Sequence, residues 1–506
     1  MRLALPALAA TALLAGCAVG PDYHRPEVET PAAWQQPADN TDNTYWQRAR
    51  PSHAALTPDW WQAFKDPLLD ELETRALAAN QTLAAATAHY AQARATLAST
   101  AAAQLPSVGL NAGASREKIS ADRPLTNYAQ RNQSTVQNDM QIGAAASYEL
   151  ELFGRIRRNV EAARASTEQS ADDLANARLV LTADLATAYL ALRETDAEIN
   201  VLNRSVALQQ KALDFVSAQH ELGAVSGLNL LLQRSLLDAT CTKAQLLLNT
   251  RQQYEHAIAT LVGTPAPSFS IAARVQPLIA PALPTGLPSD LLQRRPDVAS
   301  AERAMAAANA QIGVARAAYF PRIVLSPDIG WDATNFASLF TVPALLWSVG
   351  AAVSQPLFEG GRLKAGVDFA QAGYQATQAN YRQTVLGAFE EVQNAVTGLS
   401  TLDEAERRAC AALEDARRLV SLAQDRYAGG LTAYIDVISA QQQLLISERQ
   451  EVQIRGQRAT LVVYLAKALG GNWSATDPAG GGDTPASTGA AAAADLVAGP
   501  DKLKKK

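Results

Sequence analysis

Two long stretches without proline dominate this chain of 506 residues. The prolines that bound them are Pro124, Pro265, Pro356 and Pro478. Proline lacks a backbone N–H and clashes with the preceding helical turn, so stretches free of it can hold very long helices. Helical periodicity covers residues 154–221 and again 361–428. At 1.5 Å per residue, this predicts two helices of about 100 Å each.

Each predicted long helix ends in a glycine turn and is followed by a return helix. The first turn runs from Gly223 to Gly227, and the second contains Gly429 and Gly430. We expect Gly223, Gly429 and Gly430 to supply the positive φ angles that tight turns between antiparallel helices need. Before each turn, apolar residues repeat at alternating steps of three and four, which indicates a coiled-coil seam. The seam residues are Ile199, Leu202, Val206, Leu213 and Val216, then Leu413, Ala416, Val420, Ala423 and Tyr427.

Four shorter segments have a period of two instead of 3.6. They are residues 107–114, 139–152, 323–331 and 345–353, in which apolar side chains alternate with polar ones or glycine. An aliphatic row on one face and a polar row on the other are what a lipid-exposed barrel strand around a watery lumen requires. The same alternation is typical of half-buried strands in a soluble sandwich.

The order helix, two strands, long helix, turn and return helix occurs twice. The sequence therefore predicts repeats at 68–263 and 289–473, joined by a proline-rich linker at 264–288. Each repeat opens with a helix, the first over residues 68–104 and the second over 289–319. One constant offset places Gly154 against Gly361, Gly223 against Gly430, and Asn229 against Asp436.

The two ends of the chain have different compositions from the repeats. Residues 1–16 combine a basic Arg2 with a short apolar run, as in a secretory signal peptide. The sequence Leu-Ala-Gly-Cys ending at Cys17 resembles a bacterial lipobox, which implies a covalent lipid on Cys17 and sorting to the outer membrane of a Gram-negative bacterium. An ordinary signal peptide cleaved nearby is the alternative. An extended arm is predicted at 17–67, and a disordered tail at 474–506.

The sequence carries no sign of catalytic chemistry or of a bound cofactor. No nucleophile–base pair, phosphate loop or acid–base carboxylate pair stands out, and the five histidines lack metal-ligand spacing. The net charge of −5 gives no reason to expect nucleic acid. Cys241 and Cys410 lie in helical patterns, and we interpret them as small packing residues; whether they pair stays open.

Four membrane-type strands cannot close a barrel, because the smallest barrels use about eight and an open edge in lipid leaves backbone groups unpaired. The chain is therefore predicted to oligomerise. Around a shared barrel, the long helices would form a tunnel that continues away from the membrane.

Four motifs resemble the outer-membrane efflux lipoproteins of the NodT type, which are relatives of TolC. They are CAVGPDYHRP, DWWQAFKDPLLDELETRALAAN, RRPDVASAERAMAAANAQIGVARAAYFP and the duplicated helix turns. The resemblance implies a mainly α protein with membrane β structure: a homotrimer with a 12-stranded barrel and a coiled-coil periplasmic tunnel. It also implies coupling to an inner-membrane pump through a periplasmic adaptor.

The resemblance further implies a gate at the periplasmic helix tips. By motif position, Asp436 is the carboxylate of an acidic ring, Ile435 an apolar stopper and Tyr427 a contact beside the hinge. From the residues alone, Asp436 can equally be a carboxylate that the helix dipole favours in a first turn. Some relatives carry a basic residue at the position of Thr432 and an acidic one at Ser439, so we expect one salt-bridge latch to be missing.

We therefore predict an outer-membrane exit duct of a tripartite efflux system that passively conducts small molecules, as in multidrug resistance. A structural coiled-coil envelope lipoprotein is the alternative from another class. The alternating strands favour a duct, because a tether needs no lumen. Metal-ion efflux and protein secretion remain open within ducts, although only three methionines give no support for a copper path.

Overall fold

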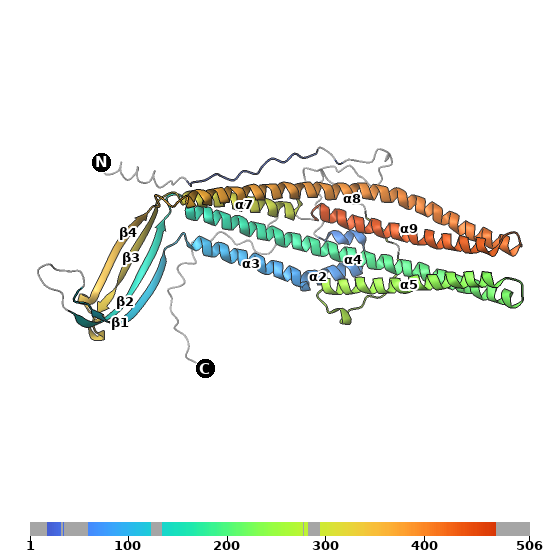
Figure 1. Cartoon of the computed structure of the whole chain (residues 1–506), viewed down its shortest axis with the longest axis horizontal. Helices are drawn as coiled ribbons and strands as arrows, with labels where there is room; N and C mark the ends of the chain where they lie inside the picture. Colours follow the sequence, from blue (N-terminus) through green and yellow to red (C-terminus); the bar gives the residue numbers. More distant parts are fainter. Residues whose placement is uncertain are drawn as a thin grey trace, which may run out of the picture.

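The computed structural model describes residues 18–31, 34, 59–122, 134–276, 278–281 and 294–471. The molecule is elongated, with a curved sheet at one end and two helical hairpins reaching the other end (Figure 1). In chain order the elements are η1 (Trp60–Phe64), α2 (Pro67–Ala79), α3 (Gln81–Ala102), β1 (Ser107–Ile119), β2 (Thr135–Leu150), α4 (Arg155–Glu221), α5 (Gly227–Leu261), η2 (Ala266–Ser268), α7 (Pro296–Ala317), β3 (Arg322–Ala333), η3 (Phe336–Ser338), η4 (Val342–Ala344), β4 (Leu345–Ser354), α8 (Arg362–Ala428) and α9 (Tyr434–Ala468).

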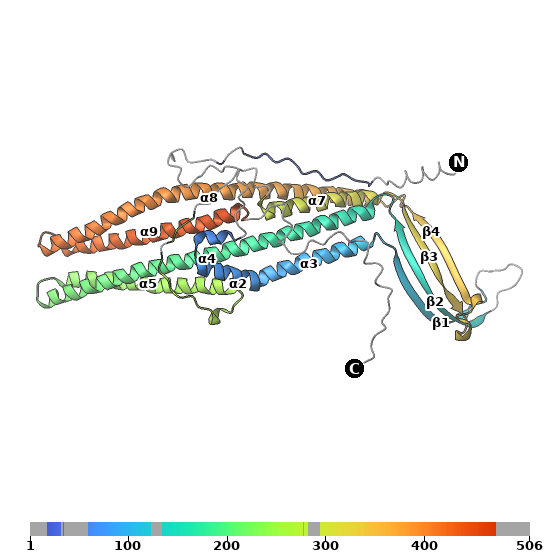
Figure 2. The same cartoon turned by 180° about the vertical axis from the view of Figure 1, so that it is seen from behind.

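The two halves of the chain repeat the same elements at the same lengths. Helices α4 and α8 each contain 67 residues, and α5 and α9 each contain 35. Both long helices start after a left-handed glycine, Gly154 with φ 79° and Gly361 with φ 90°. Both hairpin tips lie at the end of the molecule away from the sheet (Figure 2). The mainly helical, internally duplicated fold predicted from the sequence is therefore confirmed.

The four strands form one antiparallel sheet in the order β1-β2-β3-β4. The register brings Leu110, Ala144, Ile329 and Trp347 into one row across the sheet. Several apolar side chains of this face are strongly exposed in the single chain, and Trp347 is 71% exposed. Such a large apolar surface marks a face that is covered by something other than water. Strands β1 and β4 form the edges of the sheet, so their outer backbone groups have no ladder partner within the described chain.

The single helix predicted over residues 68–104 is wrong, because the structure breaks it at Asn80. This residue has φ −67° and ψ 126°, and its side-chain oxygen accepts a hydrogen bond from the Leu83 N–H at 3.0 Å. Its amide also donates to the carbonyl of Leu261 at 2.9 Å. The end of α5 packs into the break, where a Cβ on Gly263 would lie 2.5 Å from the carbonyl oxygen of Ala79. Alanine-rich sequence on both sides hides this break from a periodicity analysis.

A central core lies where α2 and η1 pack against the middle of α4, together with the ends of α5 and α9. We call it the central core; its largest buried members are Trp60, Trp61, Leu69, Leu72, Leu185, Tyr189, Leu190, Leu192, Ile258, Val262 and Val463. At its margin the Tyr189 hydroxyl donates to a carboxylate oxygen of Asp66 at 2.6 Å. The described part of the proline-rich linker is fastened beside it, because the buried Arg193 donates to the carbonyl of Ala272 at 3.1 Å. Arg193 also pairs with Asp196 at 3.0 Å, so the charge is compensated.

The described part of the N-terminal arm is bonded to the helices beside the sheet. The Val19 N–H donates to the carbonyl of Phe153 at 3.2 Å, and Arg158 pairs with Asp22 at 2.7 Å. A Cβ on Gly154 would lie 2.8 Å from the Cα of Ala18, so glycine at this position lets the arm pass. Residues 1–16, Cys17 and the tail 474–506 lie outside the described residues.

Both thiols in the described chain are free, and Cys241 is exposed on α5. The interpretation of Cys241 as a packing residue is therefore wrong within the single chain, because an exposed side chain is not packed against the described residues. Cys410 is partly exposed on α8. Among the described residues, no helix combines the length and the apolarity needed to cross a membrane.

Glu73 in α2 is the least expected residue of the interior. Its side chain is fully buried, and no described group hydrogen-bonds either carboxylate oxygen. Burial, with a smaller effect of Asp70, raises the pKa of Glu73 to about 9. Because this pKa lies above the ordinary value of 4.5, the folded state binds a proton that the unfolded state releases at neutral pH. Stability should then fall as the pH rises from about 4.5 towards 9.

We predict that Glu73→Gln raises the melting temperature by a few degrees at pH 8 and by less at pH 5, since glutamine needs no proton to be buried. Circular dichroism of the full-length protein in detergent measures both values. Glu71→Gln, at an exposed position of the same helix, is the control. Equal effects of Glu73→Gln at the two pH values would contradict the prediction.

Candidate gate at the helix tips

The two hairpin tips have the same backbone geometry. Gly223 and Gly430 each have φ 73° just beyond the end of a long helix. After them, the Ala224 N–H donates to the carbonyl of Gln219 at 2.8 Å, and the Leu431 N–H donates to that of Arg426 at 2.9 Å. This is the six-to-one hydrogen bond of a Schellman motif, which ends a helix sharply and needs glycine in the left-handed region.

The other two tip glycines do not have this conformation. Gly429 has φ −78° and continues the right-handed helix, so the expectation of a positive φ there is wrong. One left-handed residue per turn is enough to close the motif. Gly227 is the first residue of α5, and a Cβ there would make only an ordinary contact with the His220 ring, 3.7 Å away.

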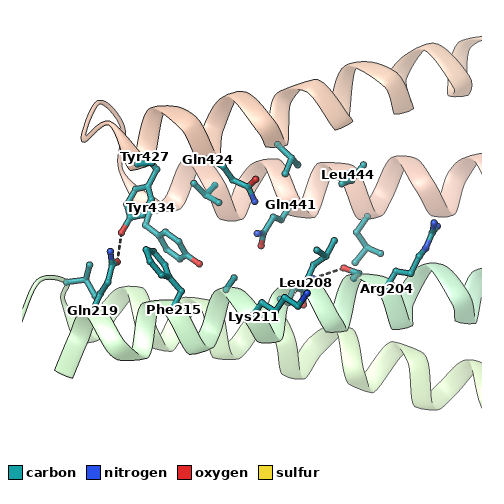
Figure 3. Close-up of a pocket in the computed structure, with 18 of the residues that line it drawn as sticks. Arg204, Leu208, Lys211, Phe215, Gln219, Gln424, Tyr427, Tyr434, Gln441 and Leu444 are labelled. Atoms are coloured by element: carbon teal, nitrogen blue, oxygen red, sulfur yellow. Dashed lines mark hydrogen bonds between the residues drawn. The ribbon is translucent and has the colours of Figure 1, made fainter. Parts of the chain in front are cut away.

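Two tyrosines join the second hairpin to the first. The Tyr427 hydroxyl, near the end of α8, donates to the side-chain oxygen of Gln219 on α4 at 3.0 Å (Figure 3). The Tyr434 hydroxyl, at the start of α9, donates to the side-chain oxygen of Gln233 on α5 at 3.0 Å. The two rings pack edge to face with centroids 5.1 Å apart. We call these two hydrogen bonds the tyrosine latch.

Gln233 makes the latch part of the protein interior. Its side chain is fully buried, and its amide donates to the backbone carbonyl of Gln209 on α4 at 3.0 Å. One glutamine thus bridges α5 to both α4 and α9. Breaking such a buried network leaves a polar group without a partner, which costs about 1–3 kcal/mol. The equivalent positions in the second repeat are Ala440 and Ala416, so only one of the two hairpins carries this bridge.

Ile435 and Asp436 lie on the other side of the same helical turn. Both are exposed, Ile435 by 46%, whereas Tyr434 and Val437 beside them are buried. Asp436 lies in the first turn of α9, where the helix dipole favours a carboxylate. Within the described residues, no ion pair includes Asp436. The single chain therefore presents both side chains on a free surface of the second tip.

A cavity of about 860 Å³ separates the two hairpins next to the latch (Figure 3). Its wall combines long polar and apolar side chains from α4, α8 and α9, among them Arg204, Leu208, Lys211, Phe215, Gln424 and Gln441. Gln219, Tyr427 and Tyr434 close it toward the tips. The latch is thus a pair of hydrogen bonds at the edge of a cavity, where the two hairpins can separate.

Of the latch residues, only Tyr427 is predicted from the sequence; Gln219, Gln233 and Tyr434 are not. Their partners lie up to 208 residues away, so no local pattern reveals them. One signal was present: the duplicate of Tyr434 is Gly227, and this difference in size marks a position where the repeats pack differently. Among the described residues, no group of histidine, cysteine or acidic side chains is arranged to hold a metal ion.

Comparisons with known proteins agree over almost the whole chain. A family model described as outer membrane efflux protein matches residues 72–264 and 287–471. The chain is 32% identical to the toluene efflux pump outer membrane protein TtgF of Pseudomonas putida, over 92% of this chain and 96% of the relative. It is 33% identical to the pyoverdine export outer membrane protein OpmQ of Pseudomonas aeruginosa, over 93% and 97%.

Solved structures have the same fold. The outer-membrane channel OprN superposes with a TM-score of 0.82 at 30% identity, over 90% of this chain and 99% of that one. The open state of the MtrE outer membrane channel of Neisseria gonorrhoeae gives 0.77 at 27% identity, over 91% and 99%.

We predict that Tyr434→Phe loosens the tips more than Tyr427→Phe does. Tyr434 is buried, so removing its hydroxyl leaves the Gln233 amide oxygen without a partner. Tyr427 is partly exposed, so water can replace its hydroxyl. Hydrogen exchange of the first turns of α9 measures the opening, and we expect it to be about tenfold faster in Tyr434→Phe. Equal exchange in the two variants would show that the buried bond adds nothing.

Proposed function

The chain belongs to the outer membrane efflux protein family, and on this basis we propose that it is the outer-membrane exit duct of a tripartite efflux system. It lies in the outer membrane of a Gram-negative bacterium and passively conducts small molecules outwards. One observation carries the proposal: a sheet with an exposed apolar face and two open edges continues directly into helices of 67 residues. The duct needs no catalytic residue, and the family is one of channels.

The functional unit that we propose is a homotrimer. Three four-stranded sheets give twelve strands when β1 of one copy pairs with β4 of the next. The closed barrel then satisfies every edge group in the lipid, and its apolar face contacts outer-membrane lipid. The exposed Trp347 and Val349 support this orientation of the sheet. The long helices of the three copies continue the barrel as a periplasmic tunnel.

The tips would meet the other components of the pump. We assign to them a periplasmic adaptor protein, which links the duct to an inner-membrane pump. Large apolar side chains are strongly exposed at both tips, and Leu222 and Leu431 are 84% and 72% exposed. Exposed apolar residues at the end of a polar helical hairpin are typical of a protein contact site.

The same tips would gate the duct. In a trimer the Asp436 carboxylates would converge near the axis, where the ring of negative charge would attract cations. Ile435 beside them would act as an apolar stopper. The tyrosine latch would hold the second hairpin in the closed position, with Tyr427 next to the hinge. The latch consists of two neutral hydrogen bonds, and Thr432 and Ser439 would add no charge to it.

Cys17 is the proposed lipidation site. The arm that follows it passes Gly154 and bonds to Phe153, at the junction between the sheet and α4. A lipid on Cys17 would therefore start beside the periplasmic face of the outer membrane. The lipid anchor and the barrel would then both attach the chain to the outer membrane at its periplasmic face.

For the gate, we predict that Asp436→Ala raises single-channel conductance and lowers cation preference in planar bilayers, because the variant removes the charged ring. Asn229→Ala is the matched control, since Asn229 is the uncharged duplicate of Asp436, and it should leave selectivity unchanged. If Asp436→Ala conducts with unaltered ion selectivity, Asp436 does not lie in the constriction.

For the function, we predict that deletion of the gene increases susceptibility to at least one compound in a panel of drugs, solvents and metal ions. Restoring the wild-type gene should reverse the change. The compound affected distinguishes drug efflux from metal-ion efflux. Unaltered susceptibility to every compound would favour protein secretion or a structural tether instead.

A further inference from the structure

A second cavity lies in the middle of the helical region, far from the tips. It has a volume of about 850 Å³ and is bounded by α4, α5, α8 and α9. We call it the acidic recess; its wall includes Asp184, Glu194, Tyr254, Leu402, Leu461 and Tyr464. Small-molecule sites have volumes of about 300–1,000 Å³ and walls of mainly apolar and aromatic side chains with a few polar groups.

The acidic recess lies beside the central core, and Ala188, Tyr254 and Leu261 both pack against that core and line the recess. Leu185, Tyr189 and Leu192 point into the central core, and α2 with η1 covers that side. At about 100° per residue, Glu194 lies about 140–180° around the same helix from these three residues, and Asp184 lies about 80–140° from them. If the central core is on the outside of the tunnel, the recess opens toward its interior.

Helix α9 leaves room for the Glu194 carboxylate. Gly456 is buried in the middle of α9, and a Cβ there would lie 2.1 Å from Oε2 of Glu194. Glycine in a helix interior costs about 1 kcal/mol relative to alanine, so its presence needs a reason. Here it forms a niche against which the carboxylate rests. The site is therefore shaped by two helices and is more than an acidic cluster on one surface.

No positive charge within the described chain neutralises Glu194. Among the described residues, no ion pair or hydrogen bond includes its carboxylate, and Arg449 on α9 pairs instead with Glu198, one turn further along α4, at 3.4 Å. Burial, followed by the charge of Glu198, raises the pKa of Glu194 to about 7. Because burial disfavours the ionised form of Glu194, a cation that enters the adjacent cavity would stabilise that form.

The wall indicates which kind of cation fits. A metal ion such as Ca²⁺ or Mg²⁺ needs several oxygen ligands, whereas Asp184 lies ten residues from Glu194, about 15 Å along α4. The tyrosines and leucines instead suit an apolar body, and aromatic rings attract organic cations. We propose that the acidic recess binds lipophilic organic monocations, with Glu194 as the counter-ion. That such cations arrive through the tunnel rests on the proposed function; the binding does not.

Binding of tetraphenylphosphonium to the full-length protein in nanodiscs tests the proposal, with empty nanodiscs as background. We expect saturable binding to the wild type and at least tenfold weaker binding to Glu194→Gln, which has the same shape. Gly456→Ala should also weaken binding, because it displaces the carboxylate. Glu414→Gln, at an exposed position on α8, is the control and should bind like the wild type.

The pH dependence identifies the group that binds. Wild-type affinity should increase from pH 6 to pH 8, because Glu194 loses its proton in this range and a cation binds the ionised form. The other titratable groups that line the recess or act on Glu194 are Asp184 and Glu198 on α4, Tyr254 on α5 and Tyr464 on α9. Glu194→Gln should remove the pH dependence, whereas Asp184→Asn should retain it.

Two outcomes would overturn the proposal. One is equal affinity of wild type and Glu194→Gln; the other is equally tight binding of the uncharged triphenylphosphine oxide. Conductance of the same preparation in planar bilayers is measured separately. A conducting protein that does not bind the cation refutes the acidic recess and leaves the duct intact. A protein that binds the cation without conducting refutes the duct and leaves the recess intact.

Discussion

The hydrogen bonding of backbone groups in lipid is the constraint on which the rest of this protein depends. A four-stranded sheet with an apolar outer face leaves the edges of β1 and β4 unpaired, and no water in the bilayer core can replace their partners. Only closure with other copies removes both edges. The helices that continue from the strands must then follow the same rotational arrangement of copies. The equal lengths of α4 and α8, and of α5 and α9, meet this requirement within one chain.

A tunnel of thin helical layers has little core, and the chain compensates with buried polar groups. Arg193 and Asp196 bind the linker to α4, and Arg295 pairs with Asp297 and with Glu391 of α8 at 2.6 Å each. Fully compensated buried charges specify one arrangement of neighbours because any other leaves a charge unpaired. Such contacts near the central core hold the helices in register, whereas at the tips a small apolar cluster around Val216, Leu236 and Tyr434 is supplemented by the two neutral hydrogen bonds of the latch.

Sequence alone predicted the parts of the fold that depend on local chemistry. The absence of proline marked the long helices, and alternation marked all four strands within a few residues. The break at Asn80 was missed because a capping asparagine looks ordinary in alanine-rich sequence, and the break is stabilised by Leu261, far along the chain. Gln233 and Gly456 were missed for the same reason. Each is explained only by a side chain from another helix.

The latch and the acidic recess respond differently to pH, and this separates their roles. Burial raises the pKa of Tyr434 to about 12, and its partner Gln233 carries no ionisable group, so the hydrogen bond between them keeps its proton throughout the physiological range. Glu194 in the wall changes its charge near neutrality. A change in periplasmic pH would therefore alter the charge that a passing molecule meets without releasing the latch. In the proposed duct, opening would then depend on a partner that binds the exposed leucines of the tips, and not on pH.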